Sequence, residues 1–362
     1  MTGKRIFGDM DKTIITASSI IIIIGLLSIY SATHARSLSP ADSFFLRQLN
    51  FLAAGVVLFL ICVSVSYQRF IDLSYIIYIF NIALLTLVLI LGRARLGAQR
   101  WFSIGDFAFQ PSEFIKLSLV LALASYLGAR KGAMGSLKSF IIPLLLLVPP
   151  FLLVLLHPDL GTALLLIPIF FFVLMISGAN IRYILVLMLT GLMSLPFFWH
   201  FLRDYQKARL AVFLNPNIDP LGAGYTIIQS KIAIGSGGLF GKGWLSGTQS
   251  QLNFLPERHT DFIFSVIGEE WGFIGAVLVV ILYLVIAKRA FAISAMTDDM
   301  HGRALVTGIG VMIAMQAVVN ILMTIGLMPV VGIPLPLVSY GGSSLISTII
   351  GIALVVNVGM RR

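Results

Sequence analysis

Ten apolar runs, each about as long as a membrane-spanning helix, constrain this chain more than any other feature of its sequence. They lie near residues 13–33, 46–66, 71–91, 112–129, 139–156, 161–178, 182–199, 261–287, 303–327 and 338–358. A helix needs about 20 mostly apolar residues to cross a bilayer. Hydrophobic residues make up 58% of the 362, charged residues only 11%, and the mean hydropathy is +1.00. The sequence therefore predicts an all-α polytopic membrane protein with about ten transmembrane helices in a single domain, residues 1–362.

The distribution of charge predicts which ends face the cytoplasm. The first run follows Lys4, Arg5 and Lys12 and is too long for a signal-peptide core, so we expect a retained signal-anchor helix. Ten spans then place both termini in the cytoplasm. The segments on that side hold 13 of the 25 basic residues against five acidic ones, as the positive-inside rule requires. Membrane orientation thus explains much of the net charge of +10 without nucleic acid, and the single Cys62 makes no disulfide.

Two larger segments fall on the outer side, residues 92–111 and about 200–260 between the seventh and eighth runs. The second is too long for an ordinary connection, so we expect it to be partly ordered, either re-entrant or lying at the membrane interface. Basic residues are out of place on this side and need a ligand or a partner. They include Arg93, Arg95, Arg100, Arg203, Lys207, Arg209, Lys231, Lys242 and Arg258.

Asp261 is the first candidate for chemistry, because it stands at the outer start of the eighth run. Thr260 is a plausible N-cap, which would put Asp261 in the first helical turn. A charged first-turn residue that only stabilises its own helix is an equally good interpretation. Below it, small residues form a stripe that predicts close packing, namely Ser265, Gly268, Gly272 and Gly275. Glu269 and Glu270 lie deeper and should face a cavity or a basic partner, or serve the structure.

Two further polar groups lie within the apolar runs. Glu113 and Lys116 share one face at the start of the fourth run, and a local ion pair that neutralises itself is the simpler interpretation. Gln316, Asn320 and Thr324 recur every fourth residue in the ninth run. Such a stripe usually makes hydrogen bonds between helices, so we interpret it as architecture.

Several motifs fail on inspection. GSGGLFGKG, residues 235–243, lacks the first glycine, the terminal hydroxyl and the preceding strand of a phosphate-binding loop. SYGGSS, residues 339–344, is not a nucleophile elbow, and Pro334 and Pro336 before it suggest a broken helix entry. The five histidines have no zinc spacing, although His157, Asp159 and His259 are all expected on the outer side. No cofactor is certain, and a divalent cation stays open.

Five motifs together resemble the SEDS family of bacterial peptidoglycan polymerases, and its elongation branch more than its division branch. They span nearly the whole chain: RWFSIGDFAFQPSEFIK, HPDLGTA, LNPNIDPLGAGYTIIQSKIAIGSGGLFGKGW, GTQSQLNFLPERHTDFIFSVIGEEWGF and PLPLVSYGGSS. The resemblance implies polymerisation of lipid II into β-1,4 glycan strands at the outer face of the bacterial cytoplasmic (inner) membrane during cell elongation. It matches Asp261 to the family's essential aspartate, and Glu113 and Lys116 to its acidic and basic pair. It also implies a class B penicillin-binding protein as the transpeptidase partner.

This chemistry agrees with the residues. Inverting displacement of an undecaprenyl pyrophosphate needs a base for the acceptor hydroxyl, which we assign to Asp261. It also needs cations to neutralise the pyrophosphate leaving group. The candidates for substrate binding are Arg100, Arg209, Lys231, Lys242 and Arg258, with Lys116, Glu113 and His259. A lipid II flippase is the alternative, but polar residues gather at the outer edge rather than at the midplane, and the halves show no repeat. A scaffold that recruits a transpeptidase is a third hypothesis.

Overall fold

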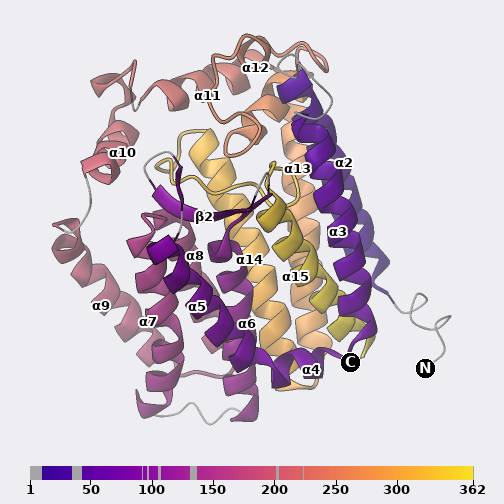
Figure 1. Ribbon diagram of the computed structural model, residues 1–362, viewed down its shortest axis with the longest axis vertical. Coiled ribbons are helices and arrows are strands. Elements are labelled where there is room, and N and C mark those ends of the chain that lie inside the picture. Colours follow the sequence, from indigo (N-terminus) through magenta and orange to yellow (C-terminus); the bar gives the residue numbers. More distant parts are fainter. Residues whose placement is uncertain are drawn as a thin grey trace.

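Long helices packed side by side make up most of the molecule (Figure 1). The computed structural model describes residues 10–34, 43–91, 93–95, 98–104, 107–130, 137–200, 204–222 and 224–361. Each of the ten apolar runs forms a helix: α2 (Lys12–Thr33), α3 (Phe44–Ser64), α5 (Ser74–Leu91), α6 (Pro111–Ala129), α7 (Ile141–Leu156), α8 (Leu160–Ile176), α9 (Ile181–Trp199), α13 (Ile263–Met296), α14 (Met300–Thr324) and α15 (Gly342–Met360). Within the described residues, seven are long and apolar enough to cross a membrane, and α7, α8 and α9 are shorter apolar helices. The prediction of a polytopic helical membrane protein is confirmed.

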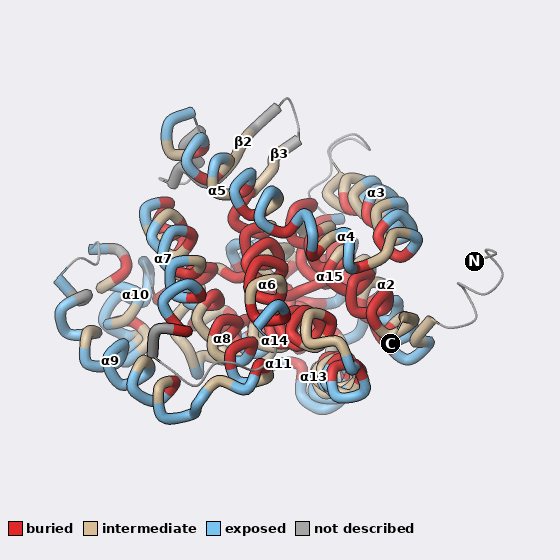
Figure 2. The backbone as a smooth tube through the Cα atoms, turned by 90° about the horizontal axis from the view of Figure 1, so that it is seen from below, coloured by how far each residue is buried: buried red, intermediate tan, exposed pale blue. Residues whose placement is uncertain are grey.

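Helix α14 lies at the centre of the bundle. It packs against α6, α8, α13 and α15, and Figure 2 shows buried backbone concentrated there. The most apolar stretches of α14, α6 and α15 are 72%, 78% and 78% buried, whereas those of α3 and α5 are 22% and 28% buried. The inner helices therefore carry the polar residues that protein must enclose, and the outer ones carry the face for lipid.

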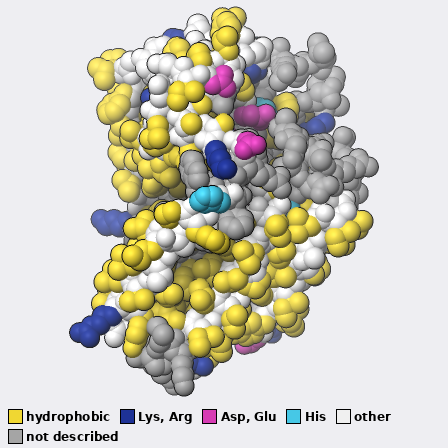
Figure 3. Space-filling model, turned by 90° about the vertical axis from the view of Figure 1, so that its left-hand side faces the viewer, with side chains coloured by type: hydrophobic (Ala, Val, Ile, Leu, Met, Phe, Trp, Pro, Cys, Tyr) yellow, Lys and Arg dark blue, Asp and Glu magenta, His cyan; other side chains and the backbone are white. Residues whose placement is uncertain are grey.

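The outer helices expose large hydrophobic side chains over their length. Ile76, Ile90 and Met193 are 65%, 72% and 80% exposed, and Figure 3 shows a broad hydrophobic surface with a group of acidic side chains above it. An apolar surface of this extent is stable only in contact with lipid or with another apolar surface.

One end of the bundle carries the two larger connecting segments. The first forms a small antiparallel sheet of β1 (Arg93–Arg95), β2 (Ala98–Ile104) and β3 (Phe107–Phe109). The all-α prediction missed this sheet, because β1 and β3 have only three residues each and the sequence of β2, AQRWFSI, does not alternate strictly between apolar and polar residues. The second holds α10 (Asp204–Leu214), η4 (Pro216–Ile218), α11 (Tyr225–Ser236) and α12 (Thr248–Gln251). Its predicted partial order is confirmed, with α11 lying across the end of the bundle (Figure 1).

The opposite end is closed by polar contacts between termini of helices. The short helices α4 (Tyr67–Asp72) and η3 (Leu137–Phe140) lie there. The Tyr67 hydroxyl donates to Asp299 Oδ2 at 3.0 Å, and Asp299 also accepts from the Gly302 N–H. Asn357 Nδ2 and Arg361 donate to carbonyl groups at the end of α3. These side chains satisfy helix ends that would otherwise lack partners.

Two interruptions of the helices shape the end of the bundle that carries the two larger connecting segments. Helix α13 is broken at Gly272, whose φ of 67° and ψ of −163° are not helical. Between α14 and α15 the chain runs without helix from residue 325 to 341, as Pro334 and Pro336 suggested. Ile333 and Leu335 in this stretch, called here the re-entrant segment (residues 325–341), are 2% and 1% exposed. Non-helical backbone so deep in a membrane protein requires protein partners for its polar groups.

Candidate functional site

Asp261 lies in a turn before α13 and not in its first helical turn. The turn covers residues 256–262, Phe262 is the N-cap, and the helix begins at Ile263. The prediction that Thr260 caps the helix was wrong, because its hydroxyl donates instead to the backbone and side-chain oxygens of Glu257, at 3.2 and 3.1 Å. Glu257 has a φ of 48°, which is rare for this residue type. Contacts within the turn, and not an N-cap bond from Thr260 to the helix, thus shape this part of the turn.

The re-entrant segment fixes this turn from the other side. Ser339 Oγ donates to Thr260 O at 2.6 Å, and Tyr340 N donates to His259 O at 2.8 Å. A Cβ atom added to Gly332 would lie 3.3 Å from Asp261 Oδ2, so the carboxylate rests against a glycine with a φ of 73°. Any larger residue at Gly332 would be strained and would crowd the carboxylate. The two segments together define where the Asp261 side chain lies.

The polar stripe of α14 holds both segments. Asn320 Nδ2 donates to Asp261 O at 2.9 Å and to Ile333 O at 2.7 Å, while Gln316 Nε2 donates to Pro334 O at 3.1 Å. The stripe was predicted to join helices, and Gln316 does so by accepting from Lys116 of α6. Gln316 and Asn320 also bind non-helical backbone. Sequence reasoning therefore missed Asn320 and Gln316 as site residues, although their spacing of four marked them out.

Glu113 and Lys116 form a buried ion pair connected to the same network. Lys116 Nζ lies 2.9 Å from Glu113 Oε2 and 2.9 Å from Gln316 Oε1. The two residues are 3% and 1% exposed. The pair is local, as the simpler interpretation held, but Gln316 joins it to Pro334 of the re-entrant segment. A charged pair this deep requires such additional hydrogen bonds.

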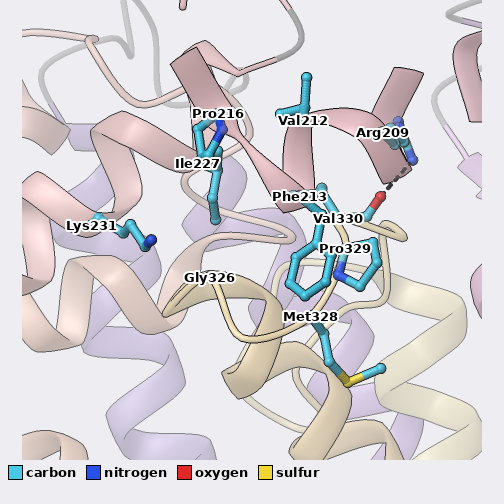
Figure 4. A pocket seen from close by; sticks show the side chains of 10 residues that line it. All are labelled: Arg209, Val212, Phe213, Pro216, Ile227, Lys231, Gly326, Met328, Pro329 and Val330. Carbon is cyan, nitrogen blue, oxygen red and sulfur yellow. Dashed lines mark hydrogen bonds between the residues drawn. The ribbon is translucent and has the colours of Figure 1, made fainter. Parts of the chain in front are cut away.

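A pocket beside the re-entrant segment brings together two of the predicted cations. The empty space within it, about 330 Å³, includes open solvent. The pocket is lined by Arg209, Val212, Phe213, Pro216, Ile227, Lys231, Gly326, Met328, Pro329 and Val330. Arg209 Nη1 donates to Val330 O at 3.1 Å (Figure 4). Lys231 is exposed and makes no hydrogen bond or ion pair with the described residues. The pocket therefore offers two cations above an apolar floor.

Three other predicted substrate-binding residues are engaged elsewhere: Lys242, Arg258 and His259. Lys242 forms an ion pair with Glu269 at 2.8 Å. Arg258 is 6% exposed, and its Nε donates to Ala32 O at the end of α2 at 2.7 Å. The His259 ring packs against the rings of Phe44 and Tyr340, at centroid distances of 4.5 and 5.7 Å. The side chain of Arg100 lies outside the described part of the structure.

The described residues contain no group of three or more His, Cys, Asp or Glu side chains suited to a metal ion. Asp159 is occupied structurally: it caps α8 through the Thr162 N–H and accepts from the hydroxyls of Ser112 and Thr162. The His157 ring lies against Leu153 O. The structure therefore brings together Asp261, the Glu113–Lys116 pair, Arg209 and Lys231 through the re-entrant segment.

Comparison with known proteins covers nearly the whole chain. Residues 11–362 match the FTSW_RODA_SPOVE family, described as cell cycle proteins. The chain is 42% identical to the peptidoglycan glycosyltransferase MrdB of Escherichia coli K12, over 99% of this chain and 97% of that protein. It is 34% identical to the peptidoglycan glycosyltransferase RodA of Treponema pallidum, with 98% of each covered. It is 37% identical to the stage V sporulation protein E of Bacillus subtilis, over 99% and 98%.

Solved structures show the same fold. A chain from a study of how a peptidoglycan synthase complex coordinates polymerization and crosslinking superposes with a TM-score of 0.82 at 36% identity, covering 98% of each chain. An aspartate-to-alanine mutant of the rod shape determining protein RodA from Thermus thermophilus superposes with a TM-score of 0.73 at 33% identity, again over 98% of each.

Proposed function

We start from the fact that this chain belongs to the FtsW/RodA/SpoVE family, and infer that it is a peptidoglycan glycosyltransferase of the rod-shape branch. Two of the relatives named above, MrdB and RodA, are peptidoglycan glycosyltransferases, so the flippase alternative is not favoured. We further propose that its substrate is lipid II and that it works at the outer face of the bacterial inner membrane.

One observation supports the assignment of residues more than any other. Within three residues, the re-entrant segment contacts both the proposed base and a cation proposed to bind the pyrophosphate. Val330 O accepts from Arg209, and Gly332 lies against the Asp261 carboxylate. A base and an anion site held by one segment would keep the acceptor hydroxyl and the leaving group at a defined separation. Such positioning supplies a large part of the rate in group transfer.

In the proposed reaction, Asp261 takes the proton of an acceptor sugar hydroxyl while that oxygen attacks the anomeric carbon of the donor. The bond from this carbon to the pyrophosphate breaks, the configuration inverts from α to β, and undecaprenyl pyrophosphate leaves with the bonding electrons. Arg209 and Lys231 would stabilise the charge on the departing pyrophosphate. Asp261 then releases its proton to water.

The Glu113–Lys116 pair supports the re-entrant segment in this proposal rather than contacting substrate. Lys116 is 1% exposed and already donates to Glu113 and Gln316. Lys242, Arg258 and His259 are likewise engaged with protein groups. Removing any of these would disturb the geometry of the site before it removed a contact to substrate.

A partner protein is part of the proposal. One superposing chain belongs to a peptidoglycan synthase complex, and we propose that this chain pairs with a class B penicillin-binding protein that crosslinks the glycan. A transpeptidase bound to the polymerase would receive each strand as it is made.

The test is a polymerisation assay with purified protein and labelled lipid II, with and without the penicillin-binding partner. We expect glycan strands from wild type and none from a folded Asp261→Asn variant. The matched control is Asp204→Asn, an exposed aspartate on α10, which should polymerise as wild type does. Equal polymer from wild type and Asp261→Asn would refute the base assignment. No polymer from wild type with its partner would refute the activity.

A further inference from the structure

The break in α13 divides this helix into two parts. Gly272 has a φ of 67° and a ψ of −163°, a conformation open essentially to glycine alone. The outer part, residues 263–271, directly follows Asp261, and the inner part runs from 273 to 296. Nine helical residues span roughly 13 Å. A rotation of the outer part of α13 about the break would therefore displace Asp261, which lies at the opposite end of that part.

A stretch of chain fills the break. We call residues 237–252 the clasp. Four backbone hydrogen bonds join the clasp to α13: Lys242 N to Glu269 O at 3.0 Å, Gly243 N to Glu270 O at 3.0 Å, Phe273 N to Gly238 O at 2.9 Å and Ile274 N to Leu239 O at 3.2 Å. The clasp thus takes over polar groups that an unbroken helix would satisfy by itself. It bonds to both parts of α13 and bridges them.

The two backbones approach too closely for side chains. A Cβ atom added to Gly237 would lie 2.0 Å from Gly268 O, and one added to Gly241 would lie 2.1 Å from Glu270 O. These contacts explain the predicted close packing of the small-residue stripe of α13. They also show that the clasp depends on glycine at defined positions.

Two adjacent buried carboxylates fasten the clasp. Glu269, which is 0% exposed, accepts through Oε1 from Lys242 Nζ at 2.8 Å, Thr248 Oγ1 at 3.0 Å and Gln249 N at 3.0 Å. Glu270, which is 2% exposed, accepts from the Ser31 hydroxyl on α2. Glu269 therefore binds the clasp, whereas Glu270 binds the first helix and also lies against the clasp at Gly247. The predicted basic partner of these acids is Lys242.

Further contacts tie the clasp to α2. Trp244 Nε1 donates to Leu27 O at 3.3 Å, and its ring stacks on Tyr30 with centroids 5.8 Å apart. Gln251 Nε2 donates to Ser31 O at 2.8 Å. The clasp is thus anchored to α2, the helix whose Ala32 O also accepts from Arg258 in the turn that holds Asp261. One helix therefore contacts both the clasp and that turn.

We propose that the clasp sets the position of Asp261, and that Glu269 and Glu270 are positioning residues for the reaction. The inference rests on the proposed function. Buried carboxylates are costly in a membrane protein unless they serve a purpose, and these two fix the angle at which the outer part of α13 carries Asp261. A displacement of about 1 Å at a reacting group lowers the rate roughly 100-fold.

The chain offers a matched pair of glycines for the test. Gly241 and Gly238 both lie in the clasp with positive φ, 80° and 56°. An added Cβ collides with Glu270 O at Gly241 but meets nothing within 4 Å at Gly238. Gly241→Ala thus opens the clasp, whereas Gly238→Ala also puts an alanine at a positive φ but leaves the contact intact. Neither glycine belongs to the catalytic or pocket residues.

Both variants are compared with wild type in the lipid II assay with the penicillin-binding partner. We expect Gly241→Ala to lower kcat roughly 100-fold with KM unchanged, and Gly238→Ala to stay near wild type. If Gly241→Ala does not fold, Glu269→Gln decides: this isosteric change breaks the Lys242 ion pair and should lower kcat about tenfold at constant KM, as weaker positioning predicts.

Three results would overturn the inference: a wild-type kcat in the clasp variants, an equal loss in Gly238→Ala, or a change confined to KM, which would assign Lys242 to substrate binding. In each case wild type still polymerises lipid II, and the proposed function stands. If wild type makes no polymer, the proposed function itself fails, and the clasp inference falls with it.

Discussion

At the scale of single residues, the structure sorts cations that the sequence left equivalent. Lys242 and Arg258 are engaged by Glu269 and by the end of α2, while Arg209 and Lys231 face one pocket. Net charge on a segment says nothing about such pairing, because the partners come from distant helices. This difference between cations bound to protein groups and cations that line the pocket is the basis of the first prediction.

We expect Lys231→Met to raise the KM for lipid II by roughly 10- to 100-fold, the loss of one hydrogen bond to a charged group. Steady-state kinetics of polymerisation measure it. Lys207→Met is the control, because Lys207 lies on α10 but does not line the pocket. An unchanged KM in the Lys231 variant would remove this residue from the substrate site.

The buried pair of Glu113 and Lys116 gives a second prediction. Lys116→Met leaves Glu113, which is 3% exposed, without its counter-charge. Removing one member of a buried pair costs about 3–5 kcal/mol, whereas replacing both is much less harmful. Thermal unfolding in detergent should therefore show a larger loss for Lys116→Met than for Lys116→Met combined with Glu113→Leu. A double variant as unstable as the sum of both single variants would show that the charges are not coupled.

The contact between Tyr67 and Asp299 predicts how stability depends on pH. Burial, followed by the hydrogen bond and charge of Asp299, raises the pKa of Tyr67 from 10.0 to about 12. Because the folded pKa is raised, this contribution to stability is complete below pH 10 and is lost as pH rises toward 12. The difference in unfolding temperature between wild type and Tyr67→Phe should therefore shrink across this window. A constant difference would contradict the assignment.

The pKa of Asp299 is shifted in the opposite direction, and so is the pH dependence of its contribution to stability. Burial opposes its charge, but hydrogen bonds from His301, the Gly302 N–H and Tyr67 outweigh burial and lower the pKa below 3.8. The stability that this carboxylate supplies is complete above pH 3.8 and lost as pH falls through the lowered value. The two residues together favour the folded state across the whole range between these windows.

At the scale of elements, the site depends on segments that are not helical. Asn320 on α14 supports the turn of Asp261 and the re-entrant segment at once. Helical periodicity identified the side chain, but no pattern in the sequence shows which carbonyl an amide will reach. Those carbonyls come from residues 59 and 13 positions away along the chain.

Asn320→Leu should therefore lower polymerisation roughly 100-fold, because the Asp261 turn loses its support. It should also destabilise the protein by about 1–3 kcal/mol for each carbonyl left buried without a donor. Thr324→Val is the control: among the described residues, the Thr324 hydroxyl donates to Ile321 O of its own helix and to no other group. Polymer yield and unfolding temperature measure the two effects. Equal behaviour of both variants would show that the bonds to Asp261 O and Ile333 O do not matter.

At the scale of the whole molecule, polar contacts join the helix ends that were predicted to face the cytoplasm. The start of α2 meets the later part of α13 through Asp11 and Arg289, and Arg361 at the end of α15 meets the end of α3. Figure 1 shows α4 at this end of the bundle and α11 and α12 at the other. The predicted cytoplasmic side and outer side thus correspond to opposite ends of one bundle.

Labelling with a membrane-impermeant maleimide tests which end faces outward. In a Cys62→Ala background, Leu252→Cys, which is 62% exposed beside α12, should react in intact spheroplasts. Asp298→Cys, in the exposed turn between α13 and α14, should react only after lysis. The positive-inside rule supplies the reason. The reverse pattern would invert the proposed orientation and place Asp261 in the cytoplasm.

The sequence by itself determined the class of fold, because apolar runs of bilayer length have few alternatives to helices when no water satisfies the backbone. It also singled out Asp261 and the Glu113–Lys116 pair, since charged residues at the edge of apolar runs are conspicuous. Its helix boundary at Thr260 failed, because the turn of residues 256–262 is held by Ser339 and Asn320 from elsewhere in the chain.

Only the tertiary structure decided which polar groups meet. The break at Gly272 is filled by a clasp from another segment, and the re-entrant segment joins the Arg209 pocket to Asp261. These contacts depend on close approach of backbones and on hydrogen bonds between residues far apart in sequence. Local periodicity records how a helix buries one face, but it carries no information on which distant chain supplies the missing partner.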